Sequence, residues 1–232
     1  MIKPPPLREI EFAFAAEAAA HAAAAAELNP FNDAESLELG DARAVYSGQW
    51  SPVHGVFGLG LDGPVEERDL REVEKFFFKK ERSAAYWITP QTDPSLAALL
   101  GRDFSPTRKI PVHGTSLPGA DFPLPDPSGS SKPDHNEWAL AFTQLLDPAS
   151  KEAGLIALTK LHQKDTRFYL SEHAASYTFF HRGMSLVPYA ASQTLLALQI
   201  KEAQDFRTTY IAATGAASPL PLLYERILYE RI

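Results

Sequence analysis

The chain has 232 residues, of which 45% are hydrophobic and 22% charged, so its composition excludes a disordered protein and allows one large domain or two small ones. Its formal net charge of −7 argues against nucleic acid as the main partner, and no segment approaches the ~20 consecutive apolar residues that span a membrane. Cysteine is absent, which excludes disulfides, thiolate zinc sites and cysteine nucleophiles. We therefore expect a globular, cytoplasmic protein without membrane association.

The first half of the chain alternates helices and strands. Helices are expected where strong helix formers follow a capping residue or precede a proline, and strands where aromatic and β-branched residues alternate with polar ones. In chain order, we expect a helix over 9–28, strands over 42–47 and 53–61, a helix over 65–80, a strand over 84–89, a helix over 94–100 capped by Asp93, and a strand over 107–113.

Residues 114–133 are rich in proline, glycine and serine, and we interpret them as a linker. The linker separates an N-terminal half, residues 1–113, from a C-terminal half, residues 134–232. In the second half, we expect a helix over 135–146, strands over 153–161 and 166–175, a turn over 180–185, a helix over 188–206, a strand over 207–213 and a helix over 218–227.

The two halves share a weak internal repeat. Residues 88–104 and 211–229 each run from a strand through a polar turn into a short leucine-rich helix. This pattern favours a duplicated α/β unit, although short leucine-rich helices also resemble one another by chance. The expected fold class is α/β, with a mixed, twisted sheet flanked by helices and built from two similar halves.

Two regions resemble one known family. The segments GLGLDGPV at 58–65, FFF at 76–78 and DPSL at 93–96 resemble the N-terminal half of tandem GNAT N-acetyltransferases, and residues 153–229 resemble their second, acyl-CoA-binding half. In that family, a loop of pattern Q/R-x-x-G-x-G/A joins the fourth strand to the third helix, and its backbone amides hold the acetyl-CoA pyrophosphate. The resemblance implies the acyl-CoA N-acyltransferase fold, with acetyl-CoA as co-substrate.

The nearest match to that loop is degenerate, and it reads Arg182-Gly183-Met184-Ser185-Leu186-Val187. Arg182 fits the first position of the family pattern, whereas Ser185 and Val187 replace its small residues. A β-branched valine hinders close approach of the backbone to a phosphate, and Pro188 removes one further N–H donor. The N-terminal half has no such loop, because residues 63–67 are acidic where the phosphate would lie.

Three residues are candidates for catalysis by this resemblance. The family's catalytic acid is a tyrosine on the helix after the fifth strand, and Tyr224 matches it, so that Tyr224 would protonate the leaving thiolate of CoA. The alternative is a tyrosine that only packs its ring. Glu172 and His173 lie on the strand that carries the family's general base. Because strand side chains alternate, at most one of them faces the cleft, and either could simply face solvent.

Family members continue after that helix with two more strands, which do not follow here before Ile232. Strands of the first half, or a second subunit, would then complete the sheet, or the acceptor pocket would be incomplete. A homodimer is therefore one expected assembly. No histidine pair has the spacing of metal ligands, so we expect no metal.

Other chemistries have little support. The glycines of Gly58-x-Gly60-x-x-Gly63 imitate a dinucleotide fingerprint, but the first two fall within a predicted strand and a proline and two glutamates follow the third. The G-x-S-x-G pattern of serine hydrolases is absent.

Two functional hypotheses remain open. The first is an N-acetyltransferase that moves an acetyl group from acetyl-CoA to an amine of a small molecule or peptide, as Arg182 and Tyr224 favour. The second is a non-catalytic binding or interaction protein of the same fold that has lost acetyl-CoA chemistry, as Val187 and Pro188 favour.

Overall fold

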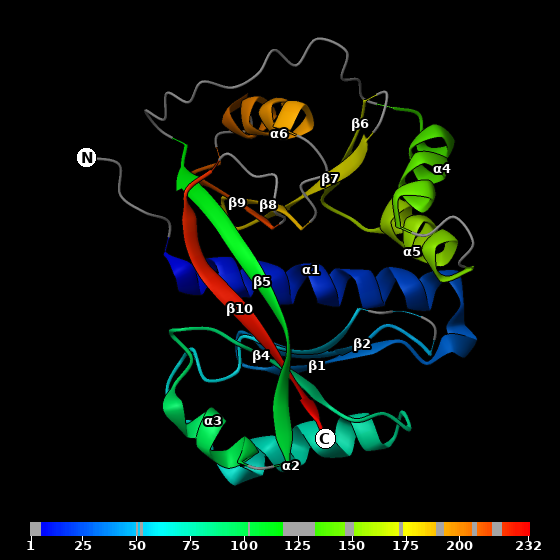
Figure 1. The fold of residues 1–232 in the computed structure, drawn as a ribbon. Helices are drawn as coiled ribbons and strands as arrows, with labels where there is room; N and C mark the ends of the chain where they lie inside the picture. Colours follow the sequence, from blue (N-terminus) through cyan, green and yellow to red (C-terminus); the bar gives the residue numbers. More distant parts are fainter. Residues whose placement is uncertain are drawn as a thin grey trace. The chain divides into compact units, whose positions relative to one another are not determined.

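A computed structural model describes residues 6–49, 51, 53–101, 103–117, 133–146, 151–171, 174–188, 193–205, 208–214 and 220–232. The chain forms two compact units, each made of two stretches of sequence. Unit 1 comprises Met1–Ala13 and Pro111–Leu223, and unit 2 comprises Phe14–Ile110 and Tyr224–Ile232. Three elements run from one unit into the other: α1 (Leu7–Leu28), β5 (Phe104–Ser116) and β10 (Leu222–Arg231) (Figure 1).

Unit 2 contains a mixed sheet in the strand order β1-β2-β3-β4-β10-β5. Its own strands are β1 (Glu35–Leu39), β2 (Ala42–Tyr46), β3 (His54–Phe57) and β4 (Ala85–Ile88). β3 and β4 are parallel and are joined through α2 (Glu67–Phe78), whereas β1–β2, β2–β3 and β4–β10 are antiparallel. A 3₁₀ turn (Pro30–Asn32) follows α1, and α3 (Pro94–Leu100) follows β4.

Side chains alternate across the sheet of unit 2 because successive strand residues point to opposite faces. On one face, the strands pack against α2 and α3, and Tyr86 of β4 joins Phe77 and Leu96 in a buried cluster. On the other face, α1 covers the sheet, and the Arg226 guanidinium of β10 lies 4.0 Å from the centre of the Phe14 ring. The sheet of unit 2 is thus covered by helices on both faces (Figure 1).

Unit 1 contains the remaining strands of the same ten-stranded sheet, in the order β5-β9-β8-β7-β6. Its strands are β6 (Thr166–Ser171), β7 (Ala174–His181), β8 (Met184–Val187) and β9 (Tyr210–Thr214). β8 and β9 are parallel and are joined through α6 (Gln193–Asp205), and the other pairs are antiparallel. α4 (His135–Leu146) and α5 (Lys151–His162) pack on the β6–β7 end through Trp138 and Phe142, and α6 packs on the opposite face through Leu195 and Tyr169. Each unit therefore contains one parallel βαβ crossover.

The α/β fold class with a mixed sheet and flanking helices is confirmed. The predicted helices over 9–28, 94–100 and 135–146 are present with bounds within two residues of those expected. The strand predicted over 153–161 is wrong, because this segment forms α5. The helix predicted over 218–227 is also wrong, because its described part from Leu222 onward forms β10. The repeat proposed between 88–104 and 211–229 is therefore incomplete, because the first copy contains a helix, α3, where the second copy contains β10.

Of the two expected ways to complete the sheet, the structure contains the first. β5, from the N-terminal half of the sequence, pairs with β9 from Val112↔Thr214 to Ser116↔Tyr210. It includes Gly114, Thr115 and Ser116, which begin the segment interpreted as a linker, whereas residues 118–132 lie outside the described residues. Among the described helices, none is both long and apolar enough to cross a membrane.

Candidate functional site

The residues predicted to hold a pyrophosphate begin with a hairpin turn. Arg182 and Gly183 connect β7 to β8, with φ values of 45° and 78°. Two consecutive residues with positive φ are what a two-residue turn between antiparallel strands requires, and glycine adopts this conformation without strain. The geometry of the turn therefore explains why a glycine occupies position 183.

The next four residues, Met184, Ser185, Leu186 and Val187, form β8 and are all buried. All four pair with β9 on one side, and the first three also pair with β7 on the other. Backbone groups that are used in sheet pairing are not available to a phosphate. The prediction of a loop over 182–187 is wrong, because the family pattern was matched by spacing while the apolar residues on both sides of Arg182-Gly183 extend a hairpin.

The strand-to-helix crossover of unit 1 lies directly after β8. β8 ends at Val187 and α6 begins at Gln193, so that residues 188–192 connect them, and only Pro188 of these is described. The Thr214 hydroxyl, at the end of β9, donates a hydrogen bond to the Pro188 carbonyl. No acidic residue occurs between positions 188 and 193. The first N–H groups of a helix at such a crossover have no intrahelical acceptor and favour an anion.

Tyr224 lies on a strand and not on a helix. In β10, the side chains of Tyr224, Arg226 and Leu228 are buried, whereas Glu225 between the first two is exposed. Tyr224 as a whole is 6% exposed. The sequence LYERI, which occurs twice in succession, fits both the helical and the strand period, and the pairing of β10 with β4 selects the strand.

Glu172 and His173 lie outside the described residues. They fall between β6, which ends at Ser171, and β7, which begins at Ala174. The single strand predicted over 166–175 is wrong, because β6 and β7 are two antiparallel strands paired from Thr166↔Phe179 to Ser171↔Ala174.

Beneath α6 lies a buried polar network that the sequence pattern did not reveal. The Tyr169 hydroxyl donates to a carboxylate oxygen of Glu202, and Gln199 Nε2 donates to Ser176 Oγ at 3.0 Å. Trp138 Nε1 donates to the Ser176 carbonyl at 2.8 Å. Burial, and then the hydrogen bond and charge of Glu202, raise the pKa of Tyr169, so its hydroxyl keeps its proton. These bonds fix the helix that begins at the crossover. The spacing of Gln199 and Glu202, three residues apart on an apolar helix, was the available signal.

The corresponding crossover of unit 2 is acidic, and its N–H groups are already bonded. The Asp69 carboxylate accepts a hydrogen bond from the Glu66 N–H at 2.9 Å, and the Val65 N–H donates to Ser95 Oγ at 2.8 Å. A cavity of about 210 Å³ lies at this turn, and Asp62 and Asp69 line it. Carboxylates at a helix N-terminus take the place of an anionic ligand. This crossover therefore does not fit the pyrophosphate of an acyl-CoA.

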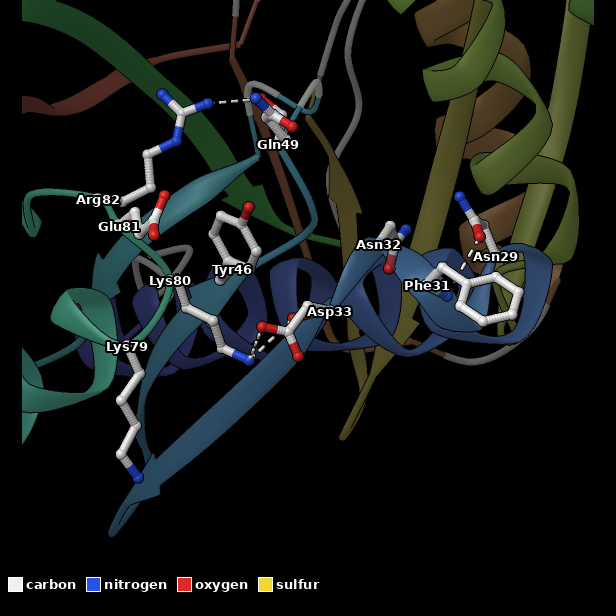
Figure 2. Close-up of a pocket in the computed structure, with 10 residues that line it drawn as sticks. All are labelled: Asn29, Phe31, Asn32, Asp33, Tyr46, Gln49, Lys79, Lys80, Glu81 and Arg82. Carbon is white, nitrogen blue, oxygen red and sulfur yellow. Dashed lines mark hydrogen bonds and ion pairs between the residues drawn. The ribbon is translucent and has the colours of Figure 1, made fainter.

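A polar pocket of about 580 Å³ lies elsewhere in unit 2, near the C-terminal ends of α1 and α2 (Figure 2). Lys80 Nζ is 2.9 Å from both Asp33 Oδ2 and Glu35 Oε2. Burial lowers the pKa of Lys80, but hydrogen bonds and charge from these two carboxylates outweigh it, so that the pKa is raised. At the rim, Arg82 donates to the Gln49 carbonyl at 2.6 Å. The positive charge of Lys80 is therefore neutralised by carboxylates of the same chain.

No cluster of three or more His, Asp or Glu side chains that could hold a metal ion occurs in the described part of the chain.

No family model and no curated protein matches this chain. Solved structures do match it. A GCN5-related N-acetyltransferase from Kribbella flavida has a TM-score of 0.57 at 14% identity, over 92% of this chain and 95% of the other. A GCN5-related N-acetyltransferase from Sphaerobacter thermophilus has a TM-score of 0.54 at 13% identity, over 100% of this chain and 95% of the other. A conserved protein of unknown function from Bacteroides thetaiotaomicron has a TM-score of 0.54 at 10% identity, over 100% of both chains. The chain therefore has the fold of the GNAT N-acetyltransferases.

Proposed function

We propose that this protein is a GNAT-type N-acetyltransferase that moves an acetyl group from acetyl-CoA to an amine. The supporting observation is the parallel β8–α6–β9 crossover of unit 1, in a chain with the fold of two proteins named as GCN5-related N-acetyltransferases. The amine nitrogen attacks the thioester carbonyl, a C–N bond forms and the C–S bond breaks. The amine gives up a proton, and the CoA thiolate takes one.

We place the donor site at residues 188–192 rather than at 182–187. Three observations support this position: the crossover carries no acidic residue, Pro188 is bonded to Thr214 at the end of the neighbouring parallel strand, and the buried network fixes α6. The crossover of unit 2, with its carboxylates and bonded N–H groups, is the contrasting case.

A pair of substitutions tests this position by calorimetric titration with acetyl-CoA and CoA. Wild-type protein should bind CoA with a Kd at or below about 1 mM, which corresponds to about −4 kcal/mol. Ala191→Asp adds a negative charge at the crossover and should weaken binding at least about tenfold. Gly183→Asp adds the same charge at the hairpin turn, where aspartate tolerates positive φ, and should leave the affinity unchanged. Unchanged affinity in Ala191→Asp would refute the position of the site.

The catalytic residues remain proposals with their own tests. Tyr224→Phe should lower turnover at constant CoA affinity if Tyr224 is the acid. If a base lies between β6 and β7, either Glu172→Gln or His173→Gln should lower turnover, and the other should not.

A second function, a non-catalytic binding protein of the same fold, is favoured by the burial of Tyr224 on β10. A tyrosine enclosed in a sheet packs its ring, whereas a catalytic acid must reach the leaving group. Absence of CoA binding by the folded protein would select this second function.

A further inference from the structure

A pocket of about 440 Å³ lies at the C-terminal end of α2 in unit 2, and we call it the basic pocket. α2, the chain that leads into β4, the start of β5 and the end of β10 contribute to its wall. Four basic side chains and one acidic side chain line it: Arg71, Lys75, Arg82, Arg231 and Glu74. It lies at the C-terminal end of α2, whereas the acidic crossover lies at the N-terminal end of that helix.

The charge of the basic pocket is opposite in sign to that of the whole chain. Four cations and one carboxylate give a local charge of +3, whereas the chain carries −7. The carboxylates of the chain itself neutralise this positive charge only weakly. Arg231 and Glu74 are 3.6 Å apart, and both side chains are about half exposed. Arg71 and Glu67 are likewise 3.6 Å apart and more than 70% exposed. Exposed ion pairs of this kind contribute little and leave the cations available.

Two further cations of the pocket have no carboxylate partner in the part of the chain that the structure describes. Arg82 bonds to a neutral group, the Gln49 carbonyl, and the Lys75 ammonium makes no hydrogen bond or ion pair there. This differs from Lys80 in the neighbouring polar pocket, which two carboxylates hold at 2.9 Å. The basic pocket is thus the one of these two that is prepared for an external anion.

Aromatic rings border these cations. Phe78, the last residue of α2, is 82% exposed, although phenylalanine is normally a buried residue. Phe104 is buried in the wall of the pocket, with the Arg231 guanidinium 5.6 Å from the centre of its ring. A flat apolar group placed against Phe78 would remove that ring from water, which favours binding.

Next to Phe104 lies a buried hydroxyl with unused hydrogen-bonding capacity. The Tyr86 ring meets the Phe104 ring edge-on at 5.4 Å, and Tyr86 is 1% exposed. Among the described residues, its hydroxyl has no hydrogen-bond partner, which is rare for a buried polar group. Burial, and then the charge of Glu74, raise the pKa of Tyr86, and Arg231 opposes them. The Tyr86 hydroxyl therefore keeps its proton behind Phe104, and the charges of Glu74 and Arg231, which line the pocket, act on it.

We propose that the basic pocket binds a small aromatic anion, meaning a planar aromatic group that carries a phosphate or a carboxylate. The Arg231 guanidinium can bind such an anion through paired N–H donors, and the Lys75 ammonium adds a positive point charge, while the aromatic part lies against Phe78. The site lies wholly in unit 2 and shares no residue with the proposed acetyl-CoA site. It is a second ligand site, beyond the proposed acetyl transfer.

Calorimetric titration with 1-naphthyl phosphate tests the proposal. Inorganic phosphate and 1-naphthol, the two parts of this probe, are titrated separately for comparison. The complete probe should bind one site per chain, at least about tenfold more tightly than either part. Arg231→Gln should weaken binding about tenfold, because it removes a charge-assisted hydrogen bond. Phe78→Ala should weaken the binding of 1-naphthyl phosphate but not the binding of inorganic phosphate. The matched control is Arg108→Gln, which removes the same charge from an exposed position of β5 and should leave the affinity unchanged.

Two results would overturn the proposal. The first is that Arg231→Gln binds 1-naphthyl phosphate as tightly as wild type. The second is that Arg108→Gln loses as much affinity as Arg231→Gln, which would mean that the overall charge of the chain causes binding. Far-UV circular dichroism identifies a variant that fails to fold, and Lys75→Gln, at an exposed helix position, then replaces Arg231→Gln. The titration contains no CoA, so its failure leaves the proposed acetyl transfer untouched, and a failure of CoA binding leaves this site untouched.

Discussion

Substituting alanine for Gly114 tests how tightly β5 is held in unit 1. Gly114 pairs with Ala212 of β9, and its N–H donates to the Pro221 carbonyl at 3.0 Å. A Cβ atom at this position would lie 2.7 Å from the Ile211 carbonyl oxygen and 2.9 Å from Leu223 Cδ1. The leucine methyl can rotate away. The carbonyl cannot, because β9 is paired on both sides, with β5 and β8.

The cost follows from this geometry. An ordinary contact begins near 3.4 Å, so the two strands must separate locally by about 0.7 Å. Overpacking in a well-packed region costs about 1–3 kcal/mol, and contact with a fixed backbone atom belongs to the upper part of that range. In a chain of this size, 1 kcal/mol shifts the melting temperature by about 2–4 °C. Gly114→Ala should therefore lower the melting temperature by about 4–12 °C.

Gly154→Ala is the matched control for this substitution. Gly154 lies in α5, where an added Cβ meets nothing within 4 Å. Alanine is favoured over glycine in a helix by about 0.5–1 kcal/mol, so this variant should melt higher than wild type. Thermal and urea denaturation followed by circular dichroism measure both variants. If Gly114→Ala melts at or above the wild-type temperature, Gly114 is not packed in a strand, and the linker interpretation from residue 114 is favoured.

Three other substitutions, one of them with a matched control, have defined outcomes. Tyr169→Phe should reduce the free energy of unfolding by about 1–3 kcal/mol, because Glu202 stays buried with one hydrogen bond fewer, and an unchanged urea midpoint would contradict the buried pair. Lys80→Met should lower the free energy of unfolding by about 1 kcal/mol at pH 7, whereas Lys79→Met, at an exposed position that forms no ion pair with the described residues, should leave the melting temperature unchanged. Since the folded-state pKa of Lys80 is raised from 10.5, its contribution is complete below pH 10.5 and is lost as the pH rises through the folded-state value, so the two proteins should converge in alkali. Hydrogen bonds from Ser95 lower the pKa of Asp93 from 3.8. The contribution of Asp93 to stability is therefore present above pH 3.8 and is lost on further acidification. Asp93→Asn should therefore show a smaller loss of melting temperature on acidification than wild type, and equal slopes would exclude this contribution.

Elements whose signals lie within one turn of chain could be predicted from the sequence. Asp93 accepts a hydrogen bond from the Ser95 N–H at 2.9 Å, and Pro94 occupies the first helical position, so that α3 has the predicted bounds. Alanine-rich α1 likewise ends at Leu28, before Asn29-Pro30. Local chemistry decides these ends, and no distant partner is needed.

Two elements whose identity depends on a distant partner, α5 and β10, were predicted wrongly. The segment 153–161 is a short apolar run that fits either a strand or a helix. As α5 it buries Ala153 and Ala157, four residues apart, and leaves Leu158 half exposed, because α4 offers a helical packing surface. β10 is a strand because β4 and β5 provide neighbours on both sides.

The donor site that we propose lies at another place in the chain than the loop that the resemblance indicates. The resemblance placed a phosphate loop at Arg182, whereas the crossover between parallel strands begins at Pro188. The basic pocket could not be predicted, because Lys75 and Phe78 come from α2, whereas Arg231 comes from the other end of the chain. The same holds for Arg226, whose buried guanidinium lies against rings from α1, β3 and β4.

The passage of β5 and β10 through both units determines when each unit can finish folding. In unit 2, β10 lies between β4 and β5, and its Leu228 pairs with Trp87 of β4. All of β6 to β9 lies between these two positions in the sequence, so a ribosome makes nearly the whole of unit 1 before unit 2 receives its sixth strand. Until then, β4 and β5 each present an unpaired edge, which is a template for aggregation. Pairing across such a separation is also slow, so unit 2 is the part of a nascent chain that most needs protection.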